Sequence, residues 1–159
     1  MGILKKAFKF KDDVAPNSCE MDGALLVMRI MLALFFVVHG YSKLFGEMGI
    51  DGFTGMLVGL GVPAAGMFAL LVGVAEFFGG LAILLGILTR FSALWLTIIT
   101  LYAWIAVKGF SFTGGADMDV LALGLTVGLL IAGPGAISVS GQMAKKAAAE
   151  PEVKETPEA

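Results

Sequence analysis

Glu76 is the residue whose type and position most require a chemical explanation, because it places an ionisable carboxyl inside a long apolar run. The run covers residues 64–88, enough to cross a bilayer, and Glu76 stands at its midpoint. A charge at that depth costs at least ~2.5–3.5 kcal/mol on insertion scales, so ionisable groups inside spans usually face the bundle interior and mark functional sites. Glu76 is therefore a candidate for proton exchange or for a buried hydrogen bond.

Small residues surround this carboxyl on the predicted helix. Gly73, Gly79 and Gly80 lie three or four positions from Glu76 and share its face. A face without side chains allows a second helix to approach closely. The alternative to a chemical role is that Glu76 only fastens that second helix through a polar contact.

A second group of ionisable side chains lies in the preceding apolar run, residues 24–45. His39 and Lys43 are four positions apart and so share a helix face, whereas Arg29 stands near the other end. Arg29 and Lys43 are long enough to extend to opposite interfaces, and this is the interpretation we favour for Lys43. His39 has no such reach, which makes it the second candidate for chemistry.

The composition indicates an integral membrane protein. Hydrophobic residues make up 58% of the chain and charged residues 15%, with a mean hydropathy of +0.90. Soluble domains average about 25% charged residues. We expect an all-α membrane protein, a bundle of four transmembrane helices at residues 24–45, 64–88, 91–107 and 119–139.

The segment between the first two spans, residues 49–63, is too short to cross. Its apolar residues recur at helical spacing after Asp51, which we expect to cap the helix; they are Phe53, Met56, Leu57 and Leu60. This pattern predicts a short interfacial or re-entrant helix that covers the mouth of the bundle. A plain amphipathic connector is the alternative.

The ends of the chain differ from its centre. Residues 1–23 are expected to form a cytoplasmic basic amphipathic tail, with an unstructured basic tail as the alternative. Residues 24–140 should form the membrane domain and residues 141–159 a disordered cytoplasmic tail. In the fourth span, Gly124 and Gly128 have the spacing of a close-packing face, and residues 133–135, in the last third of the span, should bend or end the helix.

The distribution of Lys and Arg predicts orientation. In a four-span arrangement nine fall on one side and two, Lys43 and Lys108, on the other; the nine are Lys5, Lys6, Lys9, Lys11, Arg29, Arg90, Lys145, Lys146 and Lys154. Both termini should therefore be cytoplasmic. His39 would then lie roughly 7.5 Å outward of Glu76, with Arg29 displaced similarly inward, so that the two bracket the carboxyl.

Several spaced polar and glycine residues resemble those of the DoxX-like integral membrane proteins. The matching segments are His39-Gly40 with Lys43-Leu44-Phe45-Gly46, then Gly61-Val62-Pro63, then Glu76 with Gly79-Gly80, Gly86 and Thr89-Arg90. The resemblance covers residues 29–135 and implies a four-helix inner-membrane protein. Some relatives are subunits of a thiosulfate:quinone oxidoreductase, and others are linked to redox or sulfur stress.

By matching position, the resemblance transfers four polar residues to this chain: His39, Lys43, Glu76 and Arg90. Family members commonly close the fourth helix with a glycine-rich turn running into an acidic residue. This chain instead has Ser138 and Ser140 after the turn, so nothing is transferred at that end.

Two functional classes follow. In the first, the chain is a quinone-interacting subunit of a membrane oxidoreductase: His39 and Glu76 hydrogen-bond the quinone oxygens and relay protons, and Arg29 or Lys43 holds negative charge. Arg90 completes the candidate binding set. In the second, the chain is a non-catalytic anchor or assembly partner. A solute or proton pathway along the glycine face is a third class with less support.

Cofactors and partners follow from what the sequence contains. The single Cys19 excludes an internal disulfide and a cysteine-ligated cluster, and one histidine cannot supply both ligands of a bis-histidine haem. We expect no metal and no covalently bound cofactor, with a quinone as the candidate ligand. Electrons would come from another membrane or peripheral redox subunit. Membrane lipid and a second copy of the chain are the other expected partners, and nothing indicates nucleic acid.

Overall fold

The computed structural model describes residues 18–149, which are entirely helical apart from turns. In chain order the elements are α2 (Ser18–Leu44), α3 (Gly49–Gly59), α4 (Ala65–Leu85), α5 (Thr89–Tyr102), the π-helical turn η1 (Ala103–Val107), α6 (Ala116–Ala132) and α7 (Val139–Ala149). The all-helical prediction is confirmed. Most of the predicted basic tail lies outside the described residues, and residues 18–23 begin α2.

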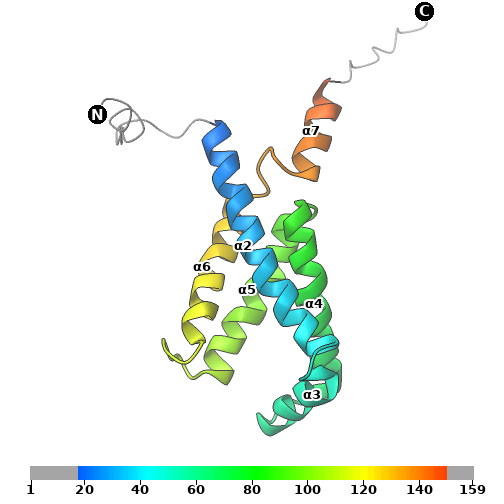
Figure 1. The fold of residues 1–159 in the computed structure, drawn as a ribbon, viewed down its shortest axis with the longest axis vertical. Helices are drawn as coiled ribbons and strands as arrows, with labels where there is room; N and C mark the ends of the chain where they lie inside the picture. Colours follow the sequence, from blue (N-terminus) through cyan, green and yellow to red (C-terminus); the bar gives the residue numbers. More distant parts are fainter. Residues whose placement is uncertain (1–17, 150–159) are drawn as a thin grey trace, which may run out of the picture.

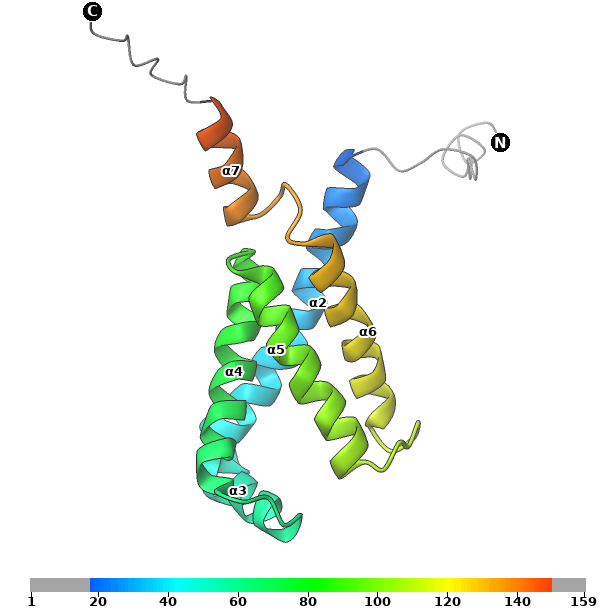
Figure 2. The same cartoon turned by 180° about the vertical axis from the view of Figure 1, so that it is seen from behind.

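Helices α2, α4, α5 and α6 run alternately from one end of the bundle to the other (Figure 1). The start of α2 and the whole of α7 lie at one end, and α3 lies at the opposite end; the reverse view shows α5 and α6 side by side (Figure 2). Within the described residues, three helices are long and apolar enough to cross a membrane: Ser18–Leu44, Ala65–Leu85 and Thr89–Val107. Helix α6 has 17 residues, about 26 Å at the usual rise, so the fourth crossing stays a prediction.

Glycines bring α2 and α4 into close contact, as predicted for Gly73 and Gly80, whereas Gly79 faces Leu96 of α5. A Cβ on Gly40 would fall within 2.8 Å of the Phe77 Cα, and a Cβ on Gly80 within 3.0 Å of the Val37 side chain. Because Gly40 faces Phe77 and Val37 faces Gly80, the antiparallel register places Tyr41 level with Glu76.

Helix α3 folds against the first turns of α4. Phe53 and Leu57 are buried in a small core with Ala65 and Ala69, whereas Met56 and Leu60 are exposed. Only half of the predicted apolar stripe therefore packs. The helix begins at Gly49 without a side-chain cap, so the prediction that Asp51 caps it is wrong. Whether α3 is interfacial or re-entrant stays a prediction.

The break predicted in the last third of the fourth span is confirmed, and the helix ends there instead of continuing to residue 139. Helix α6 ends before Gly133, whose φ of 82° is accessible mainly to glycine. Ser138 then caps α7, because its Oγ accepts a hydrogen bond from the Gly141 N–H at 2.9 Å. The chain is helical over residues 141–149, where we expected a disordered tail, and residues 150–159 lie outside the described part.

The predicted close-packing face of α6 is only half present. A Cβ on Gly128 would lie 3.2 Å from the Met28 side chain. A Cβ on Gly124 would meet nothing within 4 Å among the described residues. The GxxxG spacing therefore does not mark a continuous helix contact here.

Candidate functional site

Glu76 forms an ion pair with Lys43 inside the bundle. Both carboxylate oxygens lie 2.5 Å from the Lys43 Nζ, and the Glu76 residue is only 5% exposed. The prediction that Lys43 extends to the interface is therefore wrong. Its ammonium turns inward and neutralises the carboxylate, which is the usual requirement for a buried charge.

Three helices build this ion pair. Lys43 comes from the last turn of α2 and Glu76 from the middle of α4. Gly73 lets the two backbones approach there, since a Cβ at that position would press against the Leu44 side chain at 2.7 Å. Helix α3 contributes Phe53, whose ring centroid lies 5.0 Å from the Lys43 Nζ in a cation–π contact. The pair thus has an aromatic cover on the α3 side.

His39 lies beside this pair and is exposed on the surface of α2. Its Nδ1 lies 2.8 Å from the carbonyl oxygen of Phe35, and its ring stacks on the Phe35 ring with centroids 4.2 Å apart. A carbonyl only accepts, so Nδ1 carries the proton, and Nε2 of the neutral ring is an acceptor. His39 and Glu76 share no hydrogen bond in the described structure.

The depth predicted for His39 is wrong. Since Tyr41 is level with Glu76, His39 lies about 3 Å from that level, toward the end where α2 begins, and not 7.5 Å the other way. The sequence calculation assumed that the two predicted spans are centred on one plane. The glycine contacts instead set a register in which α2 is displaced along the α4 axis from that centred alignment.

Arg29 does not bracket Glu76; it holds backbone carbonyls at the other end of the bundle. It is 2% exposed and donates four hydrogen bonds: Nε to Ile83 at 2.8 Å, Nη2 to Leu84 at 2.5 Å, and Nη1 to Pro134 at 3.2 Å and Ile137 at 2.6 Å. Ile83 and Leu84 follow Glu76 by seven and eight residues, about 10–12 Å along α4. Arg29 therefore joins the last turn of α4 to the α6–α7 turn.

Arg90 also lies at that end. Its Nη2 donates to the Ile131 carbonyl at 3.3 Å, and the side chain is otherwise exposed. The five predicted site residues thus separate into two groups. His39, Lys43 and Glu76 lie together, whereas Arg29 and Arg90 serve the opposite end.

A second ion pair was not predicted from the sequence. Asp119, which is 8% exposed on α6, has its Oδ2 2.7 Å from the Lys108 Nζ. Lys108 also donates to the Gly115 carbonyl at 2.8 Å, which fixes the loop before α6. Lys108 lies in a polar loop, and the sequence gave no sign of its ion pair apart from the acidic residues nearby. Within the described residues, no cluster of three His, Cys, Asp or Glu side chains is placed to hold a metal.

The DoxX family model matches residues 24–109, which include both members of the Lys43–Glu76 pair and His39. The chain belongs to the DoxX family. This DoxX-family protein is 35% identical over 130 residues to the inner membrane protein YqjF of Escherichia coli K12, covering 79% of this chain and 95% of YqjF.

Two further relatives show the breadth of the family. The inner membrane protein YphA of Escherichia coli K12 is 34% identical over 124 residues, covering 72% of this chain and 86% of YphA. A protein of Bacillus subtilis strain 168, provisionally named as the oxidoreductase CatD, is 30% identical over 109 residues, covering 68% of this chain and 78% of CatD. No solved structure matches the chain significantly.

Proposed function

We propose that this DoxX-family protein is a quinone-interacting subunit of an inner-membrane redox complex. The observation that carries the proposal is the buried Lys43–Glu76 ion pair with the exposed His39 at nearly the same level of the bundle. Ionisable groups inside membrane spans are functional candidates, because each must offset a large cost of leaving water. CatD, a relative provisionally named as an oxidoreductase, supports a redox role.

His39 supports the proposal because it offers a polar atom on a surface exposed within a predicted span. Its Nδ1 is held by the Phe35 carbonyl, whereas its Nε2 has no hydrogen-bond partner in the part of the chain described. A polar atom left facing hydrocarbon is costly. The hydroxyl or carbonyl of a lipid-soluble ligand would offset that cost.

Aromatic side chains near this level support a flat quinone ring as the ligand. Phe45, the residue after α2, and Phe77 of α4 have ring centroids 6.1 Å apart, and the centroids of Phe77 and Phe78 are 5.2 Å apart. Phe45 is 66% exposed and Phe78 58%. Offset and edge-to-face contacts with such rings stabilise an aromatic ligand. A quinone, when bound, would supply a redox change coupled to two protons.

Each polar residue then has a definite task. His39 holds or accepts a proton at Nε2 and donates it when the imidazole is charged. Lys43 stabilises negative charge that develops on a neighbouring oxygen, and Glu76 holds the Lys43 ammonium in place. The electrons come from another subunit. In the alternative function, an assembly anchor, the same pair would only specify helix packing.

The proposal is tested by photolabelling the full chain in lipid nanodiscs with an azide-bearing short-chain quinone and mapping the label by mass spectrometry. We expect the label in the tryptic peptide of residues 30–43, which contains His39. His39→Leu should reduce that labelling about tenfold, the loss expected for ~1.4 kcal/mol of binding free energy. Val38→Ala, a change at a 62% exposed neighbour, is the matched control and should leave it unchanged.

Labelling that is spread evenly over the exposed faces of α2 and α5, or that persists in His39→Leu, would contradict a quinone site and favour the anchor function. Purification in mild detergent gives a separate check. A redox subunit that co-purifies with the wild-type chain supports the proposal, and recovery of the chain alone argues against it.

A further inference from the structure

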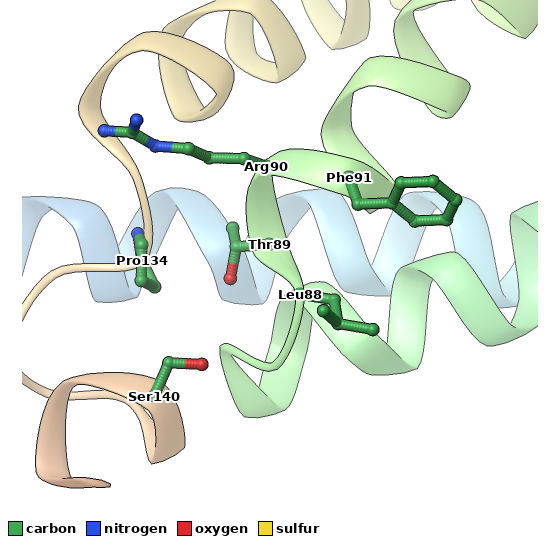
Figure 3. Close-up of a pocket in the computed structure, with 6 residues that line it drawn as sticks. All are labelled: Leu88, Thr89, Arg90, Phe91, Pro134 and Ser140. Atoms are coloured by element: carbon green, nitrogen blue, oxygen red, sulfur yellow. The ribbon is translucent and has the colours of Figure 1, made fainter. Parts of the chain in front are cut away.

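A pocket of about 390 Å³ lies at the end of the bundle opposite α3, between the start of α5 and the turn that joins α6 to α7 (Figure 3). It is separate from the Lys43–Glu76 level and has no part in the function proposed above. Its lining residues are Leu88, Thr89, Arg90, Phe91, Pro134 and Ser140.

The start of α5 presents unpaired backbone donors beside this pocket. No side chain caps the helix, and the residue at the cap position is Leu88, whose φ of 48° and ψ of 33° are unusual for a leucine. The first N–H groups of a helix have no partner inside it, and the helix dipole makes that end positive. The α5 N-terminus is therefore suited to an anion, although this feature alone would not define a site.

Thr89 supplies an independent sign of a ligand. The residue is only 2% exposed, and its Oγ1 has no hydrogen-bond partner among the described residues. Figure 3 shows that this hydroxyl points toward Ser140, on the α7 side of the pocket. A buried hydroxyl without a partner destabilises the protein, so its position is explained if a ligand oxygen accepts its hydrogen bond.

Arg90 adds a positive charge at the same helix end. Its guanidinium has five donors, and the structure gives it a single long hydrogen bond, 3.3 Å to the Ile131 carbonyl. The planar group is suited to bidentate contact with a phosphate. Backbone N–H groups, a hydroxyl and a guanidinium are donor types that commonly bind that anion, and Thr89 and Arg90 both line the pocket.

We propose that this pocket binds a phosphate group, carried by the headgroup of an anionic membrane lipid. The apolar side chains beside the donors favour a lipid over a free ion, because Leu88 is 68% exposed and Phe91 60% exposed at the rim, where acyl chains can cover them. Helix α7, which contributes Ser140 to the pocket, also carries Lys145 and Lys146. These lysines add attraction for an anionic surface.

The test measures phosphatidylglycerol binding to the full chain, by native mass spectrometry and by the rise in Tm when phosphatidylglycerol replaces phosphatidylcholine in nanodiscs. The wild type should bind one phosphatidylglycerol in preference to phosphatidylcholine and should melt at a higher temperature with it. Arg90→Gln should weaken this binding about tenfold, as loss of a charged hydrogen bond predicts.

Thr89→Val separates the site from general attraction to anionic lipid. It removes only the unpartnered hydroxyl, so the variant should fold as stably as the wild type in phosphatidylcholine yet bind phosphatidylglycerol several-fold more weakly. The matched control is Thr97→Val on the same helix, whose hydroxyl donates to the Ala93 carbonyl at 2.7 Å and should not affect lipid binding.

Other results would contradict the proposed lipid site. Two results together would overturn the lipid source. If millimolar inorganic phosphate displaces the lipid from the wild type, and the Tm is the same in both lipids, the site binds free phosphate. Equal binding of phosphatidylglycerol by the wild type, Thr89→Val and Arg90→Gln would overturn the site altogether. If Thr89→Val fails to fold, Arg90→Gln and the wild-type lipid preference still decide.

Discussion

Arg29 and Arg90 make different contacts in the bundle. Arg29 is buried and donates four hydrogen bonds to backbone carbonyls of two segments, whereas Arg90 is exposed and donates one. Hydrogen bonds from a charged group to buried carbonyls are among the stronger polar contacts in proteins. Arg29 therefore holds one end of the bundle together, although the sequence suggested a partner of Glu76.

We expect Arg29→Lys to lower the free energy of unfolding by about 2–4 kcal/mol. The donors of a lysine are all on one nitrogen atom, which cannot reach both the end of α4 and the α6–α7 turn. The matched change Arg90→Lys should alter it by less than about 0.5 kcal/mol. Thermal unfolding in detergent measures both. Equal effects of the two changes would contradict a special role for Arg29.

A separate prediction concerns the buried ion pair. Lys43→Met should destabilise the protein, because it leaves the Glu76 carboxyl, whose side chain is 7% exposed, without its partner. Glu76→Gln should cost less, since the Lys43 side chain is 18% exposed and can move toward water. The double variant should recover part of the loss, with a coupling energy of about 0.5–3 kcal/mol in a double-mutant cycle. Strictly additive effects would show that the pair is not coupled.

The sequence identified which residues are unusual better than it identified their contacts. His39 and Lys43 share a helix face, yet they differ by about 40° in direction at 100° per residue, and that difference decides which of them reaches Glu76. Arg29 binds carbonyls 54 to 108 positions away, and backbone carbonyls leave no mark in a sequence. Glu76 was found because its burial cost depends on its own type and surroundings alone.

At the level of helices, glycine spacing is informative only when a partner backbone is present. A Cβ on Gly40 would collide with the backbone of Phe77, so α2 and α4 touch there without side chains between them. Gly124 has the spacing of a packing motif but faces open space in the described structure. Sequence periodicity gave the helices and their breaks, whereas their rotation and offset depend on packing that only the structure reveals.

This difference gives a matched pair of substitutions. Gly40→Ala should destabilise the bundle by about 1–3 kcal/mol, because α2 must move away from α4 to admit the methyl group. Gly124→Ala should be neutral or stabilise by up to ~1 kcal/mol, since alanine has the higher helix propensity and meets no obstacle. Chemical unfolding in detergent compares the two. A larger loss from Gly124→Ala would indicate that α6 packs against a partner at that face.

On the scale of the whole molecule, the number of crossings decides which groups share a compartment. Helix α6 is about 26 Å long by the usual rise, somewhat shorter than the ~30 Å hydrocarbon core, a mismatch that membranes accommodate by local thinning. It packs beside α5, which is itself part of an apolar segment long enough to cross (Figure 2). A helix held alongside such a segment is expected to cross with it.

The native Cys19 makes this crossing measurable, because it is exposed at the start of α2 and is the single cysteine of the chain. In intact cells an impermeant maleimide should leave Cys19 unlabelled, as the nine-to-two charge distribution predicts a cytoplasmic position. In a Cys19→Ser background, Ala147→Cys on α7 should behave in the same way, whereas Asp51→Cys and Thr113→Cys should be labelled from outside. If Ala147→Cys is labelled in intact cells, while Cys19 of the wild-type chain is not, only three helices cross the membrane. The pocket at the start of α5 would then no longer share a membrane face with the tip of α7, and the lipid site proposed there would lose its geometric basis.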